Sequence, residues 1–186
     1  EVVVVEREPK SGGVFSSVPF ALTPGPPIRT TALRESIDVT ATAIAAGLPR
    51  LPSSAVIDIL LRRPPRTRAP GPLPRTGDPI ADITAALLDL DSSYLAVHGP
   101  PGTGKTHTAA AIIATLVNEH RWRIGVVAQS HAVVENLFRD VIGAGVDPSR
   151  VAKKKHGTGG AWTEISEKDY PAFIGAGDGC VIGGTA

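Results

Sequence analysis

The sequence predicts an α/β fold in which helices cover both faces of a parallel sheet. The first observation is the octapeptide Gly-Pro-Pro-Gly-Thr-Gly-Lys-Thr at residues 99–106, which fits the phosphate-binding pattern G-x-x-x-x-G-K-[ST] at every fixed position. The second is its context, because an apolar run at 94–97 precedes it and an Ala- and Ile-rich segment at 106–117 follows it. The third is the alternation of helical and apolar strand patterns from residue 78 onward.

Each expected element of this second part has its own pattern. Residues 80–90 show helical apolar spacing directly after Asp78 and Pro79, which are typical of a helix start. The strands are apolar throughout, as in parallel sheets that are covered on both faces. We therefore predict a RecA-like P-loop domain whose sheet is incomplete at its C-terminal end. The other expected elements are a strand at 94–97, a helix at 106–117, a strand at 123–128, a helix at 132–142, a possible strand at 150–154 and a strand at 179–182.

The residue types of the glycine loop predict that it binds the phosphates of a nucleoside triphosphate. Glycine allows the backbone to curl around a phosphate with its N–H groups pointing inward, and the N-terminus of the following helix adds the positive end of its dipole. Lys105 supplies a positive charge for the outer phosphates, and the Thr106 hydroxyl is a ligand for Mg²⁺, so these two form the candidate catalytic pair. The candidate nucleotide-binding residues are Gly99, Pro101, Gly102, Thr103, Gly104, Lys105, Thr106 and His107.

The first 77 residues are predicted to form a separate accessory region. Most of the 17 prolines precede residue 80, so only short elements fit there. Residues 63–74 are rich in Arg and Pro and have the composition of an extended or disordered linker, and we place the domain boundary near Gly77. The elements expected before the linker are strands at 2–5 and 14–22, a helix near 36–46, and a helix at 53–62 that Ser53 or Ser54 caps.

Composition limits the class of protein. The 186 residues carry a net charge of +1, and 42% are hydrophobic, which is enough to build a core. The single cysteine, Cys180, excludes an internal disulfide framework and fits a cytoplasmic location, and no apolar span long enough for a membrane occurs. One Cys and five scattered His do not make a zinc site. The chain lacks methionine and stops at an apolar run followed by Gly-Gly-Thr-Ala, so we expect a piece of a larger protein.

Two further segments carry a family resemblance. Residues 123–137, Arg-Ile-Gly-Val-Val-Ala-Gln-Ser-His-Ala-Val-Val-Glu-Asn-Leu, resemble motif Ia of superfamily 1 helicases, and residues 181–186 resemble the next family motif. With the glycine loop, they look like the first motor domain of the Upf1-like branch. The nearest resemblance is to bacterial proteins in which such a helicase follows a RecB-like nuclease domain. It covers residues 78–186 well and the earlier part only loosely.

The resemblance implies an ATP-dependent helicase or translocase that uses ATP and Mg²⁺. Ser130, His131 and Thr185 match positions at which family members contact the backbone of a single strand. The implied partners are single-stranded nucleic acid, DNA rather than RNA, and the second motor domain of the parent chain. Ser130 fits a helix N-cap equally well, and His131 fits a solvated histidine at a helix start.

The chain also departs from the family pattern. The acidic motif that organises Mg²⁺ and the attacking water, four apolar residues followed by Asp-Glu, is absent after the loop, so we expect nucleotide binding with negligible hydrolysis. An AAA+ ATPase and a binding module with a vestigial nucleotide site remain alternatives. The run Lys153–Lys155 with His156 is more typical of a solvated face than of a phosphate-binding loop. Trp122 and Trp162 are more typical of packing residues than of stacking platforms.

Overall fold

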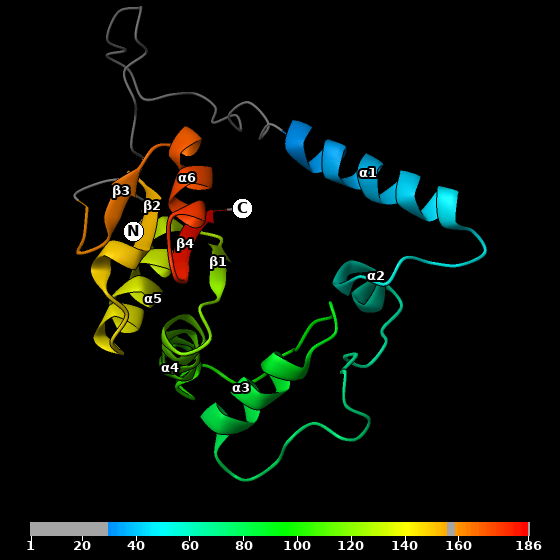
Figure 1. Ribbon diagram of the computed structural model, residues 1–186, viewed down its shortest axis with the longest axis horizontal. Coiled ribbons are helices and arrows are strands. Elements are labelled where there is room, and N and C mark those ends of the chain that lie inside the picture. The colour runs from blue at the N-terminus through cyan, green and yellow to red at the C-terminus, as the bar shows by residue number, and fades with distance from the viewer. Residues whose placement is uncertain (1–29, 156–158, 186) are drawn as a thin grey trace, which may run out of the picture. The chain divides into compact units, whose positions relative to one another are not determined.

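The computed structural model describes residues 30–155 and 159–185, which divide between two compact units, residues 1–52 and 53–186 (Figure 1). In the first unit, α1 (Thr31–Gly47) confirms the helix predicted near residues 36–46, and none of its residues is buried. The strands predicted at 2–5 and 14–22 lie outside the described residues.

The second unit shows the predicted alternation of helices and strands. The helices expected at 53–62, 80–90, 106–117 and 132–142 are all present, as are the strands expected at 123–128, 150–154 and 179–182. Two short elements, β3 (Thr163–Ile165) and α6 (Tyr170–Gly175), carry too little periodicity to be predicted. The elements in chain order are α2 (Ala55–Leu60), α3 (Pro79–Asp89), α4 (Lys105–Asn118), β1 (Arg123–Ala128), α5 (His131–Gly143), η1 (Pro148–Arg150), β2 (Val151–Lys154), β3 (Thr163–Ile165), η2 (Glu167–Asp169), α6 (Tyr170–Gly175) and β4 (Cys180–Thr185).

The described strands form one parallel sheet in the order β1-β4-β2-β3. Val181 of β4 lies opposite Ile124 of β1 on one side and opposite Val151 of β2 on the other. Helix α5 lies on one face of the sheet, and α6 lies on the other (Figure 1). The predicted α/β fold with a parallel sheet is therefore confirmed.

The core lies between this sheet and helices α4 and α5. Val134 and Phe138 of α5 are fully buried, and the Phe138 ring meets the Trp162 ring edge-on at a centroid distance of 5.7 Å. Trp162 is thus a packing residue, as predicted. A Cβ added to Gly183 of β4 would lie 2.5 Å from side-chain atoms of both Phe138 and Val134. Glycine at this position lets α5 approach the strand closely.

Capping residues define where the helices begin. Asp78 Oδ1 accepts hydrogen bonds from the backbone N–H groups of Ile80 and Ala81, and Pro79 occupies the first helical turn of α3. Ser54 Oγ accepts from the backbone of α2, which decides between the two predicted caps. These ends were predictable because each cap acts within a few residues of its own position.

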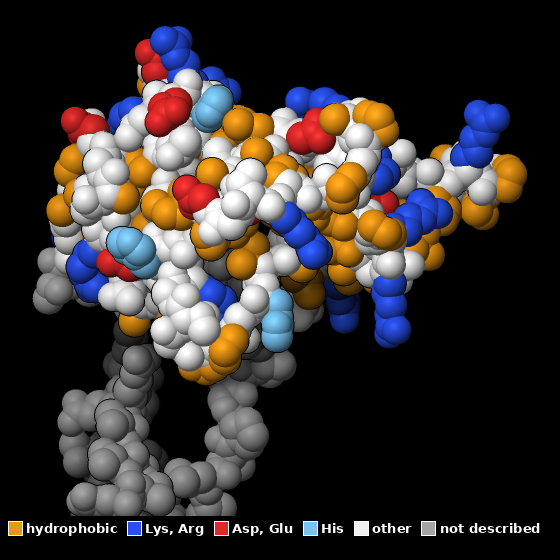
Figure 2. Space-filling view, turned by 90° about the horizontal axis from the view of Figure 1, so that it is seen from below, with side chains coloured by type: hydrophobic (Ala, Val, Ile, Leu, Met, Phe, Trp, Pro, Cys, Tyr) orange, Lys and Arg blue, Asp and Glu red, His pale blue; other side chains and the backbone are white. Residues whose placement is uncertain are grey.

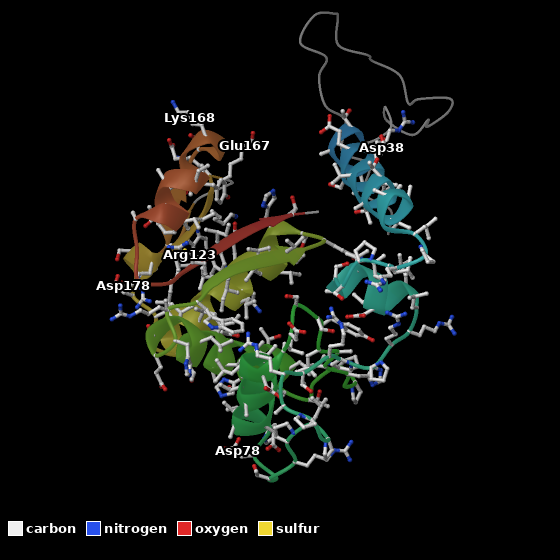
Figure 3. All side chains as sticks on the ribbon, turned by 45° about the vertical axis from the view of Figure 1, so that its right-hand side comes forward. Asp38, Asp78, Arg123, Glu167, Lys168 and Asp178 are labelled. Carbon is white, nitrogen blue, oxygen red and sulfur yellow. The ribbon has the colours of Figure 1, made fainter. Side chains whose placement is uncertain are left out.

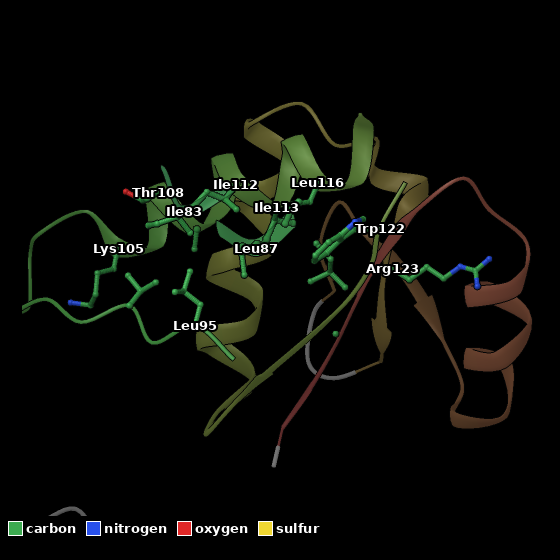
Figure 4. Close-up of a pocket in the computed structure, with 14 residues that line it drawn as sticks. Ile83, Leu87, Leu95, Lys105, Thr108, Ile112, Ile113, Leu116, Trp122 and Arg123 are labelled. Carbon is green, nitrogen blue, oxygen red and sulfur yellow. The ribbon is translucent and has the colours of Figure 1, made fainter. Parts of the chain in front are cut away.

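The apolar run at 94–97 is not the strand that the sequence predicts. Leu95 and Val97 border an apolar hollow of about 540 Å³ together with Ile112 of α4 and Ile124 of β1 (Figure 4). Among the described residues, β1 is paired with a strand only on its β4 side. A strand exists only through hydrogen bonds to a neighbouring strand, and no described strand pairs with this run. The apolar residues of this run are therefore partly buried, but the run does not join the sheet.

The Arg- and Pro-rich segment at 63–74 contacts residues that follow Gly77. Thr67 forms an isolated antiparallel bridge with Leu90, and the Arg66 guanidinium donates to Asp58 through Nε at 2.9 Å and to the Ser92 carbonyl at 3.1 Å. The segment is therefore tied to the loop that precedes the glycine-rich residues. The compact units divide between residues 52 and 53, and a boundary between functional modules near Gly77 stays a prediction.

Hydrophobic side chains are exposed over parts of the surface. Figure 2 shows them on one face, interspersed with Lys and Arg side chains. On α2, Val56, Ile59 and Leu60 are each more than half exposed, and on β1 the same is true of Val127. None of the helices in the described ranges is both long and apolar enough to cross a bilayer.

Candidate functional site

The glycine loop leads directly into α4, and two of its glycines have left-handed backbone conformations. Gly104, at the N-cap of α4, has a φ of 74°, and Gly102 has a φ of 81°. Residues with a Cβ rarely adopt these angles, so the curl of the loop depends on glycine at both positions. Lys105 is the first residue of α4, and the exposed Thr106 and His107 follow in its first turn.

The Lys105 side chain folds back into the loop. Its ammonium group donates to the carbonyl oxygens of Gly99 at 2.5 Å and Pro100 at 2.6 Å. The Thr103 hydroxyl also donates to the Pro100 carbonyl, at 2.9 Å. The ammonium therefore lies within the loop, where the phosphates of a nucleotide would replace these carbonyls as its partners. Pro101 is exposed.

The loop fits an anionic ligand. The N-cap residue of α4 is Gly104, which has no side chain to accept hydrogen bonds from the first-turn N–H groups of the helix. These N–H groups, the helix dipole and the Lys105 ammonium all favour negative charge. In the described ranges, no group of three His, Cys, Asp or Glu side chains is placed to hold a metal ion. The exposed Thr106 hydroxyl, in the first turn of α4, is a candidate ligand for a Mg²⁺ ion that accompanies phosphate.

A second hollow, of about 530 Å³, lies at the carboxyl ends of β1, β2 and β4. His131 and Thr185 both line it, so the structure brings together two of the three residues that the sequence predicts to contact nucleic acid. Ser130 does not line this hollow. Its backbone is extended, and its Oγ accepts from the backbone N–H of Val133 at 3.4 Å, which confirms the N-cap interpretation.

Three consecutive lysines, Lys153–Lys155, also line the second hollow, although the sequence favours a solvated face for them. That expectation is wrong for Lys153, whose side chain is 2% exposed and whose ammonium forms an ion pair with Glu135. Burial follows from its position in β2, beside Gly183 of β4 and below α5. The other two lysines are exposed, as predicted.

A third hollow connects the glycine loop with the flank of α5. It is lined by Lys105 and Thr106 from the start of α4 and by Glu135, Asn136 and Arg139 from α5. Sequence reasoning missed these three α5 residues. Their spacing of one, three and four residues places them on one helix face, but nothing in the sequence shows which element that face meets.

The fold and the loop together define a RecA-like P-loop domain. Residues 81–168 match the family model described as an AAA domain. A stretch of 55 residues is 42% identical to the DNA polymerase alpha-associated DNA helicase A of Schizosaccharomyces pombe. This alignment covers 30% of the present chain and 8% of the helicase. A stretch of 74 residues is 31% identical to the Regulator of nonsense transcripts 1 homolog of Arabidopsis thaliana. This alignment covers 40% of the present chain and 6% of the Arabidopsis protein.

These matches support a helicase-type P-loop domain with relatives in superfamily 1. The aligned residues span less than a tenth of the length of either curated relative. No solved structure gives a significant match to this chain.

Proposed function

We propose that this chain is the ATP-binding portion of an ATP-dependent helicase or translocase that acts on single-stranded nucleic acid. The observation that carries the proposal is the glycine loop at residues 99–106, with Gly104 left-handed and Lys105 opening α4, in a domain whose curated relatives include a DNA helicase. The same loop occurs in many classes of ATPase, so the loop alone does not identify the class. The similarity to helicases is the reason for choosing a helicase.

The proposed roles follow from the positions of the side chains. The loop N–H groups and Lys105 bind the phosphates of ATP, and Thr106 binds the Mg²⁺ that accompanies them. Bound Mg²⁺–ATP supplies the phosphoanhydride bond whose hydrolysis drives movement. On binding, the Lys105 ammonium exchanges the Gly99 and Pro100 carbonyls for phosphate oxygens. Both partners of the lysine are backbone atoms of the loop, so this exchange needs little movement elsewhere.

The remaining parts of the proposal concern partners. Ser130, His131 and Thr185 contact the strand backbone, with DNA preferred over RNA, and a second motor domain of the parent chain closes over the nucleotide. The resemblance of residues 123–137 and 181–186 to helicase motifs supports the contacts with the strand. The resemblance of the chain to bacterial nuclease–helicase fusion proteins favours a RecB-like nuclease domain in the parent protein, and the single cysteine fits a cytoplasmic location.

The isolated chain binds Mg²⁺–nucleotide and hydrolyses it negligibly, because no Asp-Glu pair follows an apolar strand after the loop. Calorimetry with ATP, ADP and GTP tests binding, and phosphate release under excess ATP tests turnover. Lys105→Ala should abolish binding, whereas Lys168→Ala, which removes an exposed lysine far along the chain, should leave it unchanged. Failure of the folded chain to bind any of the three nucleotides would refute the proposal. Multiple turnovers that Lys105→Ala abolishes would refute the inactivity of the isolated chain.

An AAA+ ATPase is the second candidate, favoured by the description of the matching family model. The two candidates differ in what accompanies nucleotide binding. AAA+ ATPases assemble into rings, so ATP should then increase the molecular mass measured by light scattering. The helicase proposal predicts a chain that stays monomeric with ATP and binds single strands.

A further inference from the structure

The hollow at the carboxyl ends of β1, β2 and β4 has a cationic rim that none of the helicase-like motifs accounts for. Lys154 and Lys155 lie at the end of β2 and line this hollow together with His131, Thr185 and Tyr170. Lys154 and Lys155 belong to neither of the two segments that resemble helicase motifs. Their presence beside His131 and Thr185 is a result of the fold.

Tyr170 holds the backbone of Lys154 in place. The Lys154 backbone N–H donates to the Tyr170 hydroxyl at 2.8 Å, and that hydroxyl donates to the Gly183 carbonyl at 3.1 Å. The tyrosine of α6 thus connects the ends of β2 and β4. A side chain that starts from a fixed backbone loses less conformational freedom on binding a ligand.

The three lysines of this run differ in how readily each can bind an anionic ligand. Lys153 is buried against Glu135 and cannot leave its partner without leaving a buried charge unpaired. Lys154 pairs with Glu167 at 2.5 Å and Lys155 with Glu164 at 3.4 Å, and the two lysine side chains are 58% and 75% exposed. Exposed ion pairs are weak because water screens them, so another anion can replace the carboxylate.

The carboxylate that pairs with Lys154 lies on the turn before α6. Figure 3 shows Glu167 and Lys168 on this turn, with their side chains pointing in different directions. Glu167 lines the hollow, and Lys168 does not. The turn therefore places one carboxylate against the cationic rim, whereas Lys168 lines an adjoining hollow together with Lys154, Lys155 and Glu164.

We propose that this hollow is a phosphate-binding site for the backbone of single-stranded nucleic acid, in which Lys154 and Lys155 exchange Glu167 and Glu164 for phosphate oxygens. The proposal rests on the proposed function, because it adds two lysines to the surface that includes His131 and Thr185. Lysine binds phosphate as a point charge and does not distinguish bases, so this binding is independent of sequence. Glu167 and Glu164 act as competing anions that weaken the binding of any one phosphate.

Fluorescence anisotropy of a labelled oligothymidylate with the full chain, over a series of salt concentrations, tests this site. Lys154→Ala/Lys155→Ala should weaken binding about tenfold and reduce the slope of log K against log salt by about 1.4, which is about 0.7 for each lysine that no longer binds a phosphate. Lys154→Ala alone should reduce the slope by about 0.7. The matched control, Arg121→Ala, removes one positive charge from an exposed ion pair that lines neither this hollow nor the adjoining one, and it should change neither quantity. Equal effects of Lys154→Ala and Arg121→Ala would show a general charge effect and overturn the site.

Glu167→Gln provides a test in the opposite direction. It removes the competing carboxylate and keeps the size of the side chain, so binding of the oligothymidylate should become severalfold tighter. Glu119→Gln removes an exposed carboxylate that lines neither this hollow nor the adjoining one, so it should give a smaller gain than Glu167→Gln. Equal gains in the two variants would show a general charge effect and overturn the proposal, as would no gain in Glu167→Gln.

The outcomes also separate this inference from the proposed function. A wild-type chain that binds ATP but no oligothymidylate would contradict the inference together with the nucleic-acid part of the function. A wild-type chain that binds the strand with the same affinity and salt slope as Lys154→Ala/Lys155→Ala would overturn the inference alone. Nucleotide binding should be unchanged in all of these variants, because none of the substituted residues lines a hollow that contains Lys105.

Discussion

The ammonium group of Lys153 lies 2.5 Å from Oε1 of Glu135, between β2 and α5. The lysine side chain is 2% exposed, and its ammonium lies 5.8 Å from the centre of the Trp162 ring. Lys153 lines the hollow at the carboxyl ends of the strands, and Glu135 lines the hollow that contains Lys105. This ion pair is therefore a direct physical link between the two candidate sites.

Removing one partner of this pair should destabilise the protein strongly. Glu135→Ala leaves the Lys153 ammonium buried without this carboxylate, which should cost about 3 to 5 kcal/mol of the free energy of unfolding. Replacing both partners, as Lys153→Met/Glu135→Leu, removes the buried charge and should recover most of that loss. Urea unfolding followed by circular dichroism measures both variants. A double variant as unstable as Glu135→Ala would contradict this account.

Gly183 should not tolerate even a methyl group. Gly183→Ala places a Cβ 2.5 Å from atoms of Phe138 and Val134, so α5 and β4 must separate, at a cost of about 1 to 3 kcal/mol. A Cβ at the neighbouring Gly184 would have no such atom within 4 Å, so Gly184→Ala is the matched control and should change stability little. Thermal unfolding of the two variants tests this, and equal melting temperatures would show that α5 and β4 are not closely packed at Gly183.

Asp58 should make the free energy of unfolding depend on pH in the acidic range. Burial raises the pKa of Asp58, but hydrogen bonds from Arg66 and Ser93 outweigh burial and hold that pKa below its usual range. The carboxylate therefore contributes stability above the unfolded pKa, about 3.9, and this contribution is lost as the pH falls through the lower folded pKa. Asp58→Asn should be less stable than wild type near neutral pH, and the difference should shrink towards pH 2. A difference that stays constant between neutral pH and pH 2 would exclude this role.

Nucleotide should stabilise the fold in proportion to its occupancy. Mg²⁺–ATP at 100 times its Kd should raise the free energy of unfolding by about 2.7 kcal/mol. Lys105→Ala should show no such increase, because its loop lacks the charge that binds the outer phosphates. Differential scanning fluorimetry with increasing ATP measures the effect. A melting temperature that rises equally in both proteins would place the nucleotide elsewhere.

Much of the fold could be predicted because its signals are local. The N-cap at Asp78, the glycine loop before Lys105 and the apolar pattern of β1 each act within a few residues, and the corresponding elements occur where expected. The segments at 163–165 and 170–175 were missed because three to six residues show no measurable period. Neighbouring elements hold them in place, because β3 pairs with β2 and Tyr170 of α6 is hydrogen-bonded to Lys154 and Gly183.

The candidate sites likewise contain some features that the local sequence predicts and others that depend on tertiary contacts. The sequence by itself determined the glycine loop at 99–106, because the conformations of Gly102 and Gly104 depend on the absence of a Cβ at those positions. Only the tertiary structure decided that residues 94–97 remain outside the sheet, that Lys153 is buried and that Lys154 and Lys155 line one hollow with His131 and Thr185. Hydrogen bonding between strands, burial and charge pairing all depend on partners far away in the chain. A local pattern supplies the side chain, and its neighbours in space decide what that side chain does.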